Sequence, residues 1–471
     1  MSILADFMRR MIIENTQELW TKIVSDNYTR NLFAMVPILQ KTGMREMVEA
    51  NLRATDGEVL DRPLGSPVVL SPWEKLLLNP VHLHRFPVDD QEKIDTSTTI
   101  GPMAERPLKL AIPIMITGMS WGSALSLNMK VALAKGASMV GTATNTGEAP
   151  LLKEERQAAK LLVGQYSRGG LISKPEDLKQ LDAIEIQLGQ GAQGAAPVFQ
   201  PSRFIGEDIR DLTNSPEGKP SKIPTRLKGV NNLNDFYQLV MELKQYGVPV
   251  GVKFAATDYM EDELKIMVDA GVDYVVVDGA EAGTHAGPTI LQDDLGLPTL
   301  IALARTSNYL EDLGVRDRVS IIAAGGLTTP GHFLKAKALG ADAVYIGTIA
   351  LIALLHTQMT KALPYEPPMQ IALYTGVFKD ELDQDKGAEN LANYLHSCQE
   401  EMRMACYAMG KKSIFAVNRA DLCSVDKDLA ALCRIRWAYR SASQPAEHEI
   451  GVGAPFGREQ VITQNNQEFL Q

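Results

Sequence analysis

The chain has 471 residues, of which 45% are hydrophobic and 22% charged, and its formal net charge is −10. This composition is typical of a globular protein that holds one large barrel with extensions or two to three domains. The acidic balance argues against nucleic acid as a partner, because phosphate binding requires excess Lys and Arg, and no apolar run approaches the roughly 18 residues that span a bilayer.

Residues 1–105 are expected to form a helical extension followed by an extended lead-in. Apolar residues recur at helical spacing in Ile3–Ile12 and Asn31–Leu39, whereas residues 56–105 are rich in proline. The start of the chain carries charges throughout and shows no signal peptide, which predicts a cytoplasmic protein. We expect these helices to pack on the barrel, with contact to a partner or a membrane surface as the less favoured alternative.

Residues 106–365 show strand-like apolar runs that alternate with helical patterns such as Leu125–Lys135 and Leu233–Tyr246. Eight strands alternating with helices predict an α/β fold, the (β/α)8 TIM barrel. The expected strands are Ile112–Ile116, Ser138–Thr142, Leu161–Gln165, Ala183–Leu188, Val250–Phe254, Tyr274–Val277, Val319–Ala323 and Ala343–Ile346.

Three further segments complete the expected organisation. The stretch from Gly189 to Gly247 is too long for a bare strand–helix connection and predicts a lid or substrate loop. Residues 366–440 predict a C-terminal helical segment with helices at Asn390–Met409 and Leu429–Trp437. Residues 441–471 form a polar tail.

Two glycine loops give the most specific functional signal. An apolar strand ends at Gly325-Gly326, and the next strand ends at Gly347-Thr348. In a barrel, the loops after strands seven and eight hold the phosphate of a cofactor or substrate, and glycine lets the backbone approach its oxygens. The alternative is an ordinary pair of strand–helix units with turn glycines.

Lys253 lies on the fifth expected strand between two apolar residues. A lysine that pointed into the apolar shell would be costly, so its amine should face an acceptor near the barrel mouth. A cation there would stabilise a reduced flavin ring. The alternative is an ion pair with Glu185 or Asp278, and the phosphate loops lead us to favour the flavin.

Polar residues at other strand ends indicate a substrate site. Arg168 offers a fork for a carboxylate, and Glu148 can exchange protons. Each could instead tie loops together. Amide side chains that suit hydrogen bonding to a heteroaromatic ring also gather there, namely Gln165, Gln187, Gln190 and Gln193.

No metal site is expected. The four cysteines, Cys398, Cys406, Cys423 and Cys433, lack the spacing of metal ligands and are expected to be free thiols. His285 has no second histidine near it in sequence and is interpreted as an ordinary polar residue.

These residues resemble the FMN-binding barrel of the glutamate synthase large subunit. The matching motifs are GMSWGS, ATNTGE, QLGQGAQG, VGVKFA and DGAEAGTHAGP, followed by the two phosphate loops. The whole chain, with SPWEKLLLNP and the C-terminal helices, resembles the short stand-alone FMN-binding glutamate synthase family proteins.

The resemblance implies a set of site residues. The FMN contacts would be Met119, Ser120, Thr144, Gln165, Gln187, Lys253 and Gly283, and the phosphate would be held by Gly325, Gly326, Gly347 and Thr348. The substrate contacts would be Glu148, Arg168, Gln190 and Gln193. Lys253 and Glu148 are the expected catalytic residues.

The chain departs from the family in three ways. It begins Met1-Ser2 and lacks the cysteine nucleophile of the family's glutaminase domain. We therefore expect that this chain does not release ammonia from glutamine by that route. The positions of the iron–sulfur cysteines match His356, Ala362 and Pro367, so that cluster is expected to be absent. Two lysines that the family places around strand four match Gln187 and Gln193, which weakens the expectation of a 2-oxoglutarate site.

The resemblance implies an FMN-dependent oxidoreductase that acts on a CH–NH2 or C=N centre in amino-acid metabolism. The reaction would be reductive amination of 2-oxoglutarate, as in glutamate biosynthesis, or the reduction of a related imine or oxidation of a related amine. A separate glutaminase would supply ammonia, and a separate protein, NAD(P)H or the substrate would supply electrons. The alternatives are a non-redox flavin-dependent isomerase and a flavin-binding subunit without its own turnover.

Overall fold

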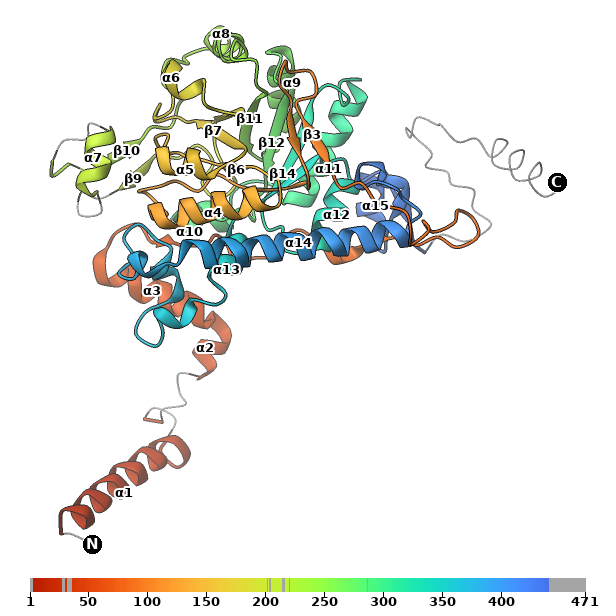
Figure 1. Ribbon diagram of the computed structural model, residues 1–471. Helices are drawn as coiled ribbons and strands as arrows, with labels where there is room; N and C mark the ends of the chain where they lie inside the picture. The colour runs from red at the N-terminus through yellow and green to blue at the C-terminus, as the bar shows by residue number, and fades with distance from the viewer. Residues whose placement is uncertain are drawn as a thin grey trace. The chain divides into compact units, whose positions relative to one another are not determined.

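The computed structural model describes residues 3–27, 30–31, 36–200, 202, 205–213, 217–219, 221–285 and 287–439 (Figure 1). The chain divides into two compact units, one that ends at Asp61 and one that begins at Arg62. The second unit contains the barrel.

The first unit consists of the helices α1 (Ile3–Val24), α2 (Val36–Thr42) and α3 (Met44–Asp56). Helix α1 continues well past the expected end at Ile12, because apolar residues recur at helical spacing as far as Val24. Part of the expected second helix, residues 32–35, lies outside the described residues. No helix among the described residues is both long and apolar enough to cross a bilayer.

The second unit is built around a closed parallel sheet, and the predicted (β/α)8 barrel is confirmed. Its strand order is β5-β15-β14-β12-β11-β8-β7-β6. Ile116 N of β5 donates to the oxygen of Ala143, the residue before β6, at 3.0 Å, which joins the two ends of that order. The strands are β5 (Ile114–Ile116), β6 (Thr144–Asn145), β7 (Leu162–Tyr166), β8 (Ala183–Gln187), β11 (Val250–Ala255), β12 (Tyr274–Asp278), β14 (Ser320–Ala324) and β15 (Ala343–Ile346).

One expected strand is wrong. Residues 138–139 end helix α4 (Leu127–Met139), and the second barrel strand begins only at Thr144. Ser126 caps the start of this helix, since its hydroxyl accepts a hydrogen bond from the Met129 amide. Its small residues pack closely, since a Cβ on Gly136 would lie 2.9 Å from Leu391. The strand expected at Ser138–Thr142 therefore overlaps the end of this helix.

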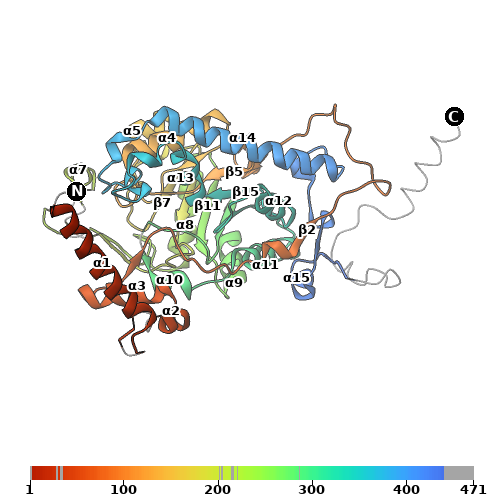
Figure 2. The same ribbon diagram turned by 90° about the horizontal axis from the view of Figure 1, so that it is seen from below.

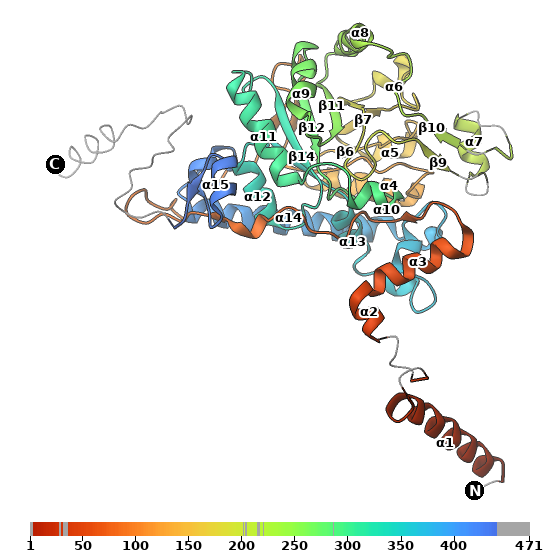
Figure 3. The same ribbon diagram turned by 180° about the vertical axis from the view of Figure 1, so that it is seen from behind.

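Helices surround the barrel (Figures 2 and 3). Helix α8 begins with a capping box between Asn232 and Asp235. Helix α8 spans Leu233–Lys244. The other helices of this layer are α5 (Lys153–Ala158), α6 (Pro175–Leu178), α9 (Met260–Asp269), α10 (Thr289–Asp293), α11 (Thr299–Asp312), α12 (Pro330–Ala338) and α13 (Thr348–Leu355).

A hairpin covers the end of the barrel opposite the candidate site. Strands β3 (Thr98–Ile100) and β4 (Leu108–Leu110) pair antiparallel. Gly101 N donates to Ser320 Oγ at 3.0 Å, at the start of β14. Leu108 and Leu110 are buried with the inward-facing side chains of the barrel strands, so this end is closed by apolar packing.

The C-terminal segment combines a long helix with a small sheet. Helix α14 (Gln384–Ala408) lies along α4 (Figure 1). Strand β16 (Leu422–Ser424) pairs with β17 (Arg436–Trp437) and with β2 (Leu76–Leu78) of the lead-in. The expected helix at 429–437 is wrong beyond Leu432, where α15 (Lys427–Leu432) ends and Arg434 turns the chain with φ 53°.

The long connection after β8 carries structure of its own. Strands β9 (Val198–Gln200) and β10 (Ser221–Ile223) pair antiparallel and flank helix α7 (Glu207–Thr213), which projects at the edge of the barrel in Figure 1. The remaining short elements are β1 (Asp61–Arg62), β13 (Gly287–Pro288) and the 3-10 helices Trp73–Lys75, Met359–Lys361, Pro368–Ile371, Lys379–Glu381, Ile414–Ala416 and Arg419–Asp421.

Candidate functional site

The loops after β5 and β6 lie against each other at the carboxyl ends of the barrel strands. Gly147 has φ +67°, and a Cβ there would lie 2.7 Å from Ser120 N, so glycine allows this approach. Ser120 Oγ accepts a hydrogen bond from Glu148 N at 3.0 Å. The structure therefore brings Met119 and Ser120, two predicted FMN contacts, next to Glu148, a predicted substrate contact.

Lys130 holds these two loops together from below, and the sequence reasoning missed it. Its Nζ donates to the carbonyl oxygens of Met119 at 2.8 Å, Asn145 at 2.9 Å and Thr146 at 3.1 Å. It also lies 2.9 Å from Glu155 Oε1, and both side chains are buried. A lysine within the otherwise apolar run of α4 is a signal that could have identified this role.

A buried polar network fills the barrel interior beneath the site. The Glu185 carboxylate accepts hydrogen bonds from Asn145 Nδ2 at 3.1 Å, Gln165 Nε2 at 2.8 Å and Tyr345 OH at 2.9 Å. Burial and the nearby Glu185 charge raise the pKa of Tyr345. Gln165, a predicted cofactor contact, therefore uses one amide N–H within the barrel and is fixed in orientation by Glu185.

Lys253 lies one layer higher on β11 and is paired with a carboxylate. Its Nζ is 3.3 Å from Asp278 Oδ2, and both side chains are almost fully buried. Asp278 Oδ2 also accepts a hydrogen bond from Gly191 N at 3.1 Å. Of the two carboxylates considered from the sequence, the partner is thus Asp278, and the ion pair lies at the strand ends where a ligand would bind.

The side chains of Glu148 and Arg168 are both buried, and each lies within the electrostatic influence of the other. Burial raises the pKa of Glu148, and the positive charge of Arg168 partly opposes this rise. Burial lowers the pKa of Arg168. One Arg168 nitrogen, Nη1, donates to Ala196 O at 3.0 Å, whereas Nε and Nη2 have no partner, and neither has Glu148 Oε1.

Other polar atoms at the ends of β6, β7 and β8 also lack partners. A buried polar group without a hydrogen bond is costly, so such atoms indicate a place where a ligand supplies the missing bonds. These atoms are Thr144 Oγ1, Ser167 Oγ and Gln187 Oε1. The register pairs Gln187 with Lys253, which places Gln187 beside the ion pair.

Gln190 and Gln193 follow β8 in the loop that also contacts Arg168. Gln190 N donates to Gly194 O at 3.1 Å, which folds the loop into a tight turn. Gln193 Nε2 donates to Thr284 Oγ1 at 2.9 Å and thereby connects this loop to the one after β12. Both predicted substrate contacts therefore lie on the same loop as Gly191, which binds Asp278.

The predicted phosphate loops meet the loop after β12. A Cβ on Gly283 would lie 3.1 Å from Thr348 Oγ1, at the start of α13. A Cβ on Gly347 would lie 3.1 Å from Thr117 Cγ2. Gly325 and Gly326 have φ +110° and +67°, and neither could carry a side chain without strain. The glycines thus form a close-packed cradle at the start of a helix.

Glu281 supports this cradle and was not identified from the sequence. Its Oε2 accepts hydrogen bonds from both the amide and the hydroxyl of Thr299, each at 2.8 Å. Thr299 Oγ1 also lies 2.9 Å from Gly325 O. The pair therefore connects the loops after β12 and β14, and no local sequence pattern indicates it.

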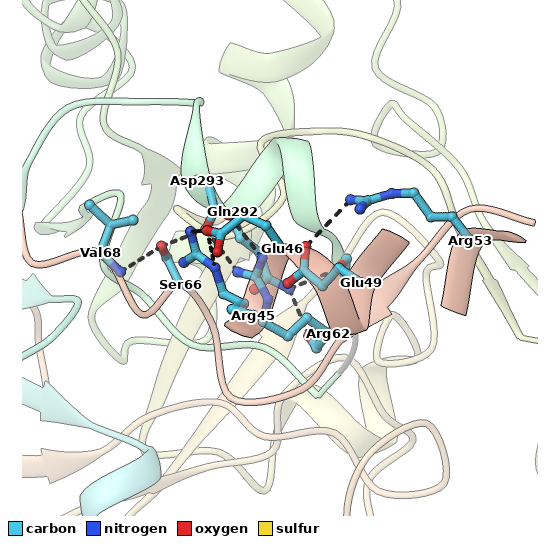
Figure 4. Close-up of polar contacts among 10 residues, drawn as sticks. Arg45, Glu46, Glu49, Arg53, Arg62, Ser66, Val68, Gln292 and Asp293 are labelled. Carbon is cyan, nitrogen blue, oxygen red and sulfur yellow. Dashed lines mark hydrogen bonds and ion pairs between the residues drawn. The ribbon is translucent and has the colours of Figure 1, made fainter. Parts of the chain in front are cut away.

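The lead-in segment also braces the loop after β12 (Figure 4). Arg62 makes a two-pronged contact with Asp293, at 2.8 and 2.9 Å, and Ser66 Oγ donates to the same carboxylate at 2.6 Å. Leu64 N donates to Thr284 O at 2.8 Å. Residues that the sequence predicts as a simple lead-in thus hold the segment that contains Gly283.

A separate apolar cluster joins the insertion to the site loops. Trp121 and Tyr374 pack edge to face with ring centroids 5.9 Å apart. Ile209 of α7 is buried in the same cluster, and the Tyr374 hydroxyl makes a short hydrogen bond to Asp208. The insertion is therefore attached both to the loop after β5 and to the C-terminal segment.

The described residues contain no group of His, Cys, Asp and Glu side chains that could hold a metal ion. The four cysteines are free, as predicted. Burial lowers the pKa of His285, which favours its neutral form, and its Nδ1 has no hydrogen-bond partner in the structure.

The chain matches a family model and several curated protein sequences. The model for the conserved region in glutamate synthase matches residues 74–412. A glutamate synthase large subunit-like protein of Rhizobium meliloti is 32% identical over 413 residues, which cover 83% of this chain and 92% of that protein. The archaeal-type glutamate synthase [NADPH] of Thermotoga neapolitana is 35% identical over 69% of this chain, which spans 64% of that protein.

Among solved structures, a mutant of flavocytochrome b2 has a TM-score of 0.50 at 17% identity, and the match covers 84% of this chain and 87% of that chain. This similarity concerns the fold alone and agrees with the barrel described above.

Proposed function

The chain belongs to the glutamate synthase family, and on that basis we propose that it is an FMN-dependent oxidoreductase that acts on a CH–NH2 or C=N centre. The candidate reactions are reductive amination of 2-oxoglutarate and the interconversion of a related amine and imine. The unpartnered polar atoms at the ends of β6, β7 and β8, together with the glycine cradle, are the observation that carries this proposal. When bound, FMN would supply hydride transfer at its N5 atom.

The residues present fit FMN. The glycines of the cradle, Gly283, Gly325, Gly326 and Gly347, leave no side chain between the backbone and a phosphate, and Thr348 begins helix α13 beside them. The proposed contacts of the ring are Met119, Ser120, Thr144, Gln165, Gln187 and Lys253. Thr144 Oγ1 and Gln187 Oε1 are buried without partners, which is what a ligand with polar ring edges would satisfy.

Lys253 holds a positive charge at the ends of the strands. The ion pair with Asp278 at 3.3 Å fixes the position of its amine. A lysine amine has three N–H donors, so the pair leaves donors free for a ligand. Lys253 would therefore stabilise negative charge that develops on a ring bound over the barrel mouth.

Glu148 is proposed to exchange a proton with the substrate. Burial raises the pKa of its carboxyl, which shifts the group toward the protonated form that can donate a proton to the substrate. Arg168 has Nε and Nη2 unpaired, and these two nitrogens match the geometry of a carboxylate. Arg168 would bind the substrate carboxylate and orient the reacting carbon near Glu148, with Gln190 and Gln193 completing the pocket.

The partners of the reaction are proposals as well. Relatives named archaeal-type glutamate synthase [NADPH] are longer than this chain, which spans 64% of the Thermotoga neapolitana protein. A separate glutaminase would supply ammonia, and NADPH or a redox protein would supply electrons.

Anaerobic flavin spectroscopy tests the proposal. Reduced FMN-loaded protein should be reoxidised by 2-oxoglutarate with ammonium or by another keto acid with ammonium, or the oxidised protein should be reduced by an amino acid. Glu148→Gln protein should keep its FMN and react more slowly. Flavin that no keto acid, imine or amine oxidises or reduces would contradict the proposal and favour a subunit without its own turnover.

A further inference from the structure

Among the described residues, most charged side chains at the ends of the barrel strands are paired with another charge or with hydrogen-bond donors. Lys253 is paired with Asp278, and Gly191 N binds the same carboxylate. Glu185 lies one layer deeper and accepts three hydrogen bonds from the barrel interior. The remaining donors of Lys253 are assigned to the proposed flavin ring, so the unpaired donors left for a substrate anion are Nε and Nη2 of Arg168.

The remaining acid does not favour a second anion. Glu148 is buried beside Arg168, and its Oε1 has no hydrogen-bond partner. In its charged form it would repel a carboxylate, and in its neutral form it offers one O–H donor. Neither form supplies the positive charge that a second carboxylate requires.

The loop after β8 lies against Arg168, since its Ala196 O accepts a hydrogen bond from Arg168 Nη1 at 3.0 Å, and residues 188–200 of this loop carry amides and no charged side chain. Gln190 and Gln193 lie on the loop after β8. Gln193 is 8% exposed, and its Nε2 donates to Thr284 Oγ1 at 2.9 Å, which fixes the amide in place. An amide pairs well with another neutral polar group, because both donate and accept hydrogen bonds. Burial of an unpaired carboxylate beside such groups would be costly.

We propose that the substrate is a small 2-amino or 2-keto acid that carries a single carboxylate, bound by Arg168, and an uncharged hydrogen-bonding side chain that faces Gln190 and Gln193. This inference rests on the proposed function and narrows it, because it places dicarboxylates such as 2-oxoglutarate among the poorer ligands.

Isothermal calorimetry with the FMN-loaded protein tests this inference by binding rather than by turnover. The probes are 2-oxoglutarate and 2-oxoglutaramate, which have the same length. 2-Oxoglutarate ends in a second carboxylate, whereas 2-oxoglutaramate has a carboxamide at that position. The expected result is a dissociation constant about tenfold or more lower for 2-oxoglutaramate, the size of one charge-assisted hydrogen bond. Equal binding, tighter binding of 2-oxoglutarate, or binding of neither compound would overturn the inference.

A variant with an added charge tests the same inference independently. Gln193→Lys adds a cation beside the proposed side-chain pocket and should shift the preference toward 2-oxoglutarate by about tenfold or more. Gln180→Lys is the matched control, because Gln180 is exposed just beyond α6 and its side-chain Nε2 donates to Glu176 O. The ligand preference of this variant should match that of the parent protein. A Gln193→Lys protein with unchanged preference would contradict the placement of the pocket.

The FMN content of each sample separates the two claims. Protein that binds no FMN would contradict the proposed function itself. Protein that binds FMN and prefers the dicarboxylate would leave the proposed function standing and would overturn only the assignment of the substrate class.

Discussion

The Nζ atom of Lys130 lies 2.9 Å from Oε1 of Glu155, and both side chains are almost fully buried. The same amine donates to three carbonyl oxygens of the loops after β5 and β6. The position of Ser120 and Glu148 therefore depends on a charge pair that lies beneath them and does not touch the proposed substrate.

Lys130→Met should lower the free energy of unfolding by about 3–5 kcal/mol, because it leaves Glu155 buried without its counter-charge. Urea denaturation measures this loss. Lys135→Met in the same helix is the control and should cost less than about 1 kcal/mol, since the Asp385 side chain that Lys135 pairs with is 84% exposed. Equal losses in the two variants would show that the Lys130 pair does not support the loops.

Glu148→Gln should change both turnover and the pH dependence of stability. Turnover should fall by about 10²–10⁴-fold if Glu148 exchanges a proton with the substrate. Burial raises the pKa of Glu148, so between its unfolded and folded pKa values the folded protein binds the extra proton. The free energy of unfolding attributable to this group therefore falls as pH rises through that window and levels off above the folded pKa.

The glutamine variant removes this titration, so its stability should decline less with rising pH and should exceed that of the parent protein above the window. Denaturation at a series of pH values measures the difference. Glu263→Gln on the exposed face of α9 is the control and should follow the parent curve. A parent-like curve for Glu148→Gln would contradict a raised pKa.

Gly283→Ala should weaken FMN binding with little effect on folding. Its added Cβ would lie 3.1 Å from Thr348 Oγ1 and 3.2 Å from Leu64 O, inside the proposed phosphate cradle. The dissociation constant for FMN, measured by fluorescence titration, should rise by about tenfold or more, as expected for the loss of one good phosphate contact. Gly331→Ala, whose Cβ would meet only Thr329 Oγ1 at 3.7 Å, should bind FMN like the parent.

Arg62→Lys should loosen the loop after β12, because an amine cannot replace the two-pronged contact of Arg62 with Asp293. The expected loss is about 1–3 kcal/mol in the free energy of unfolding. Hydrogen exchange at residues 282–285 should also increase. Lys265→Met removes an exposed pair with Asp269 on α9 and should alter neither measurement appreciably.

Tyr374→Phe should weaken the attachment of the insertion after β8, because the Tyr374 hydroxyl bonds to Asp208 in the first turn of α7. Trypsin should cleave at Arg210 about 2- to 10-fold faster, which corresponds to the loss of one hydrogen bond. Tyr365→Phe is the control, since Tyr365 is 87% exposed. Identical cleavage rates in the two variants would rule out the attachment.

The barrel was predictable from the sequence because buried parallel strands form short apolar runs that alternate with helices. Residues 138–142 were the exception, since the small apolar residues at the end of α4 have no period that separates a helix from a strand. The end of α15 was missed because Arg434 adopts a left-handed backbone that its residue type does not indicate.

The site was predictable only in part. Motif residues at the ends of strands, such as Ser120 and Glu148, do lie together, because the carboxyl ends of parallel strands meet at one face. The supporting contacts join residues far apart in sequence, as Arg62 joins Asp293 and Asp208 joins Tyr374. Such long-range pairs leave no local pattern, so one sequence could not reveal them.

FMN binding is tested most directly by the absorbance spectrum of the purified protein after incubation with FMN and removal of free flavin. The proposed function predicts the spectrum of bound oxidised flavin in proportion to protein, bleached by dithionite and much weaker in Gly283→Ala protein. A folded parent protein that retains no flavin under these conditions would contradict the claim that its glycine cradle and strand-end residues hold FMN.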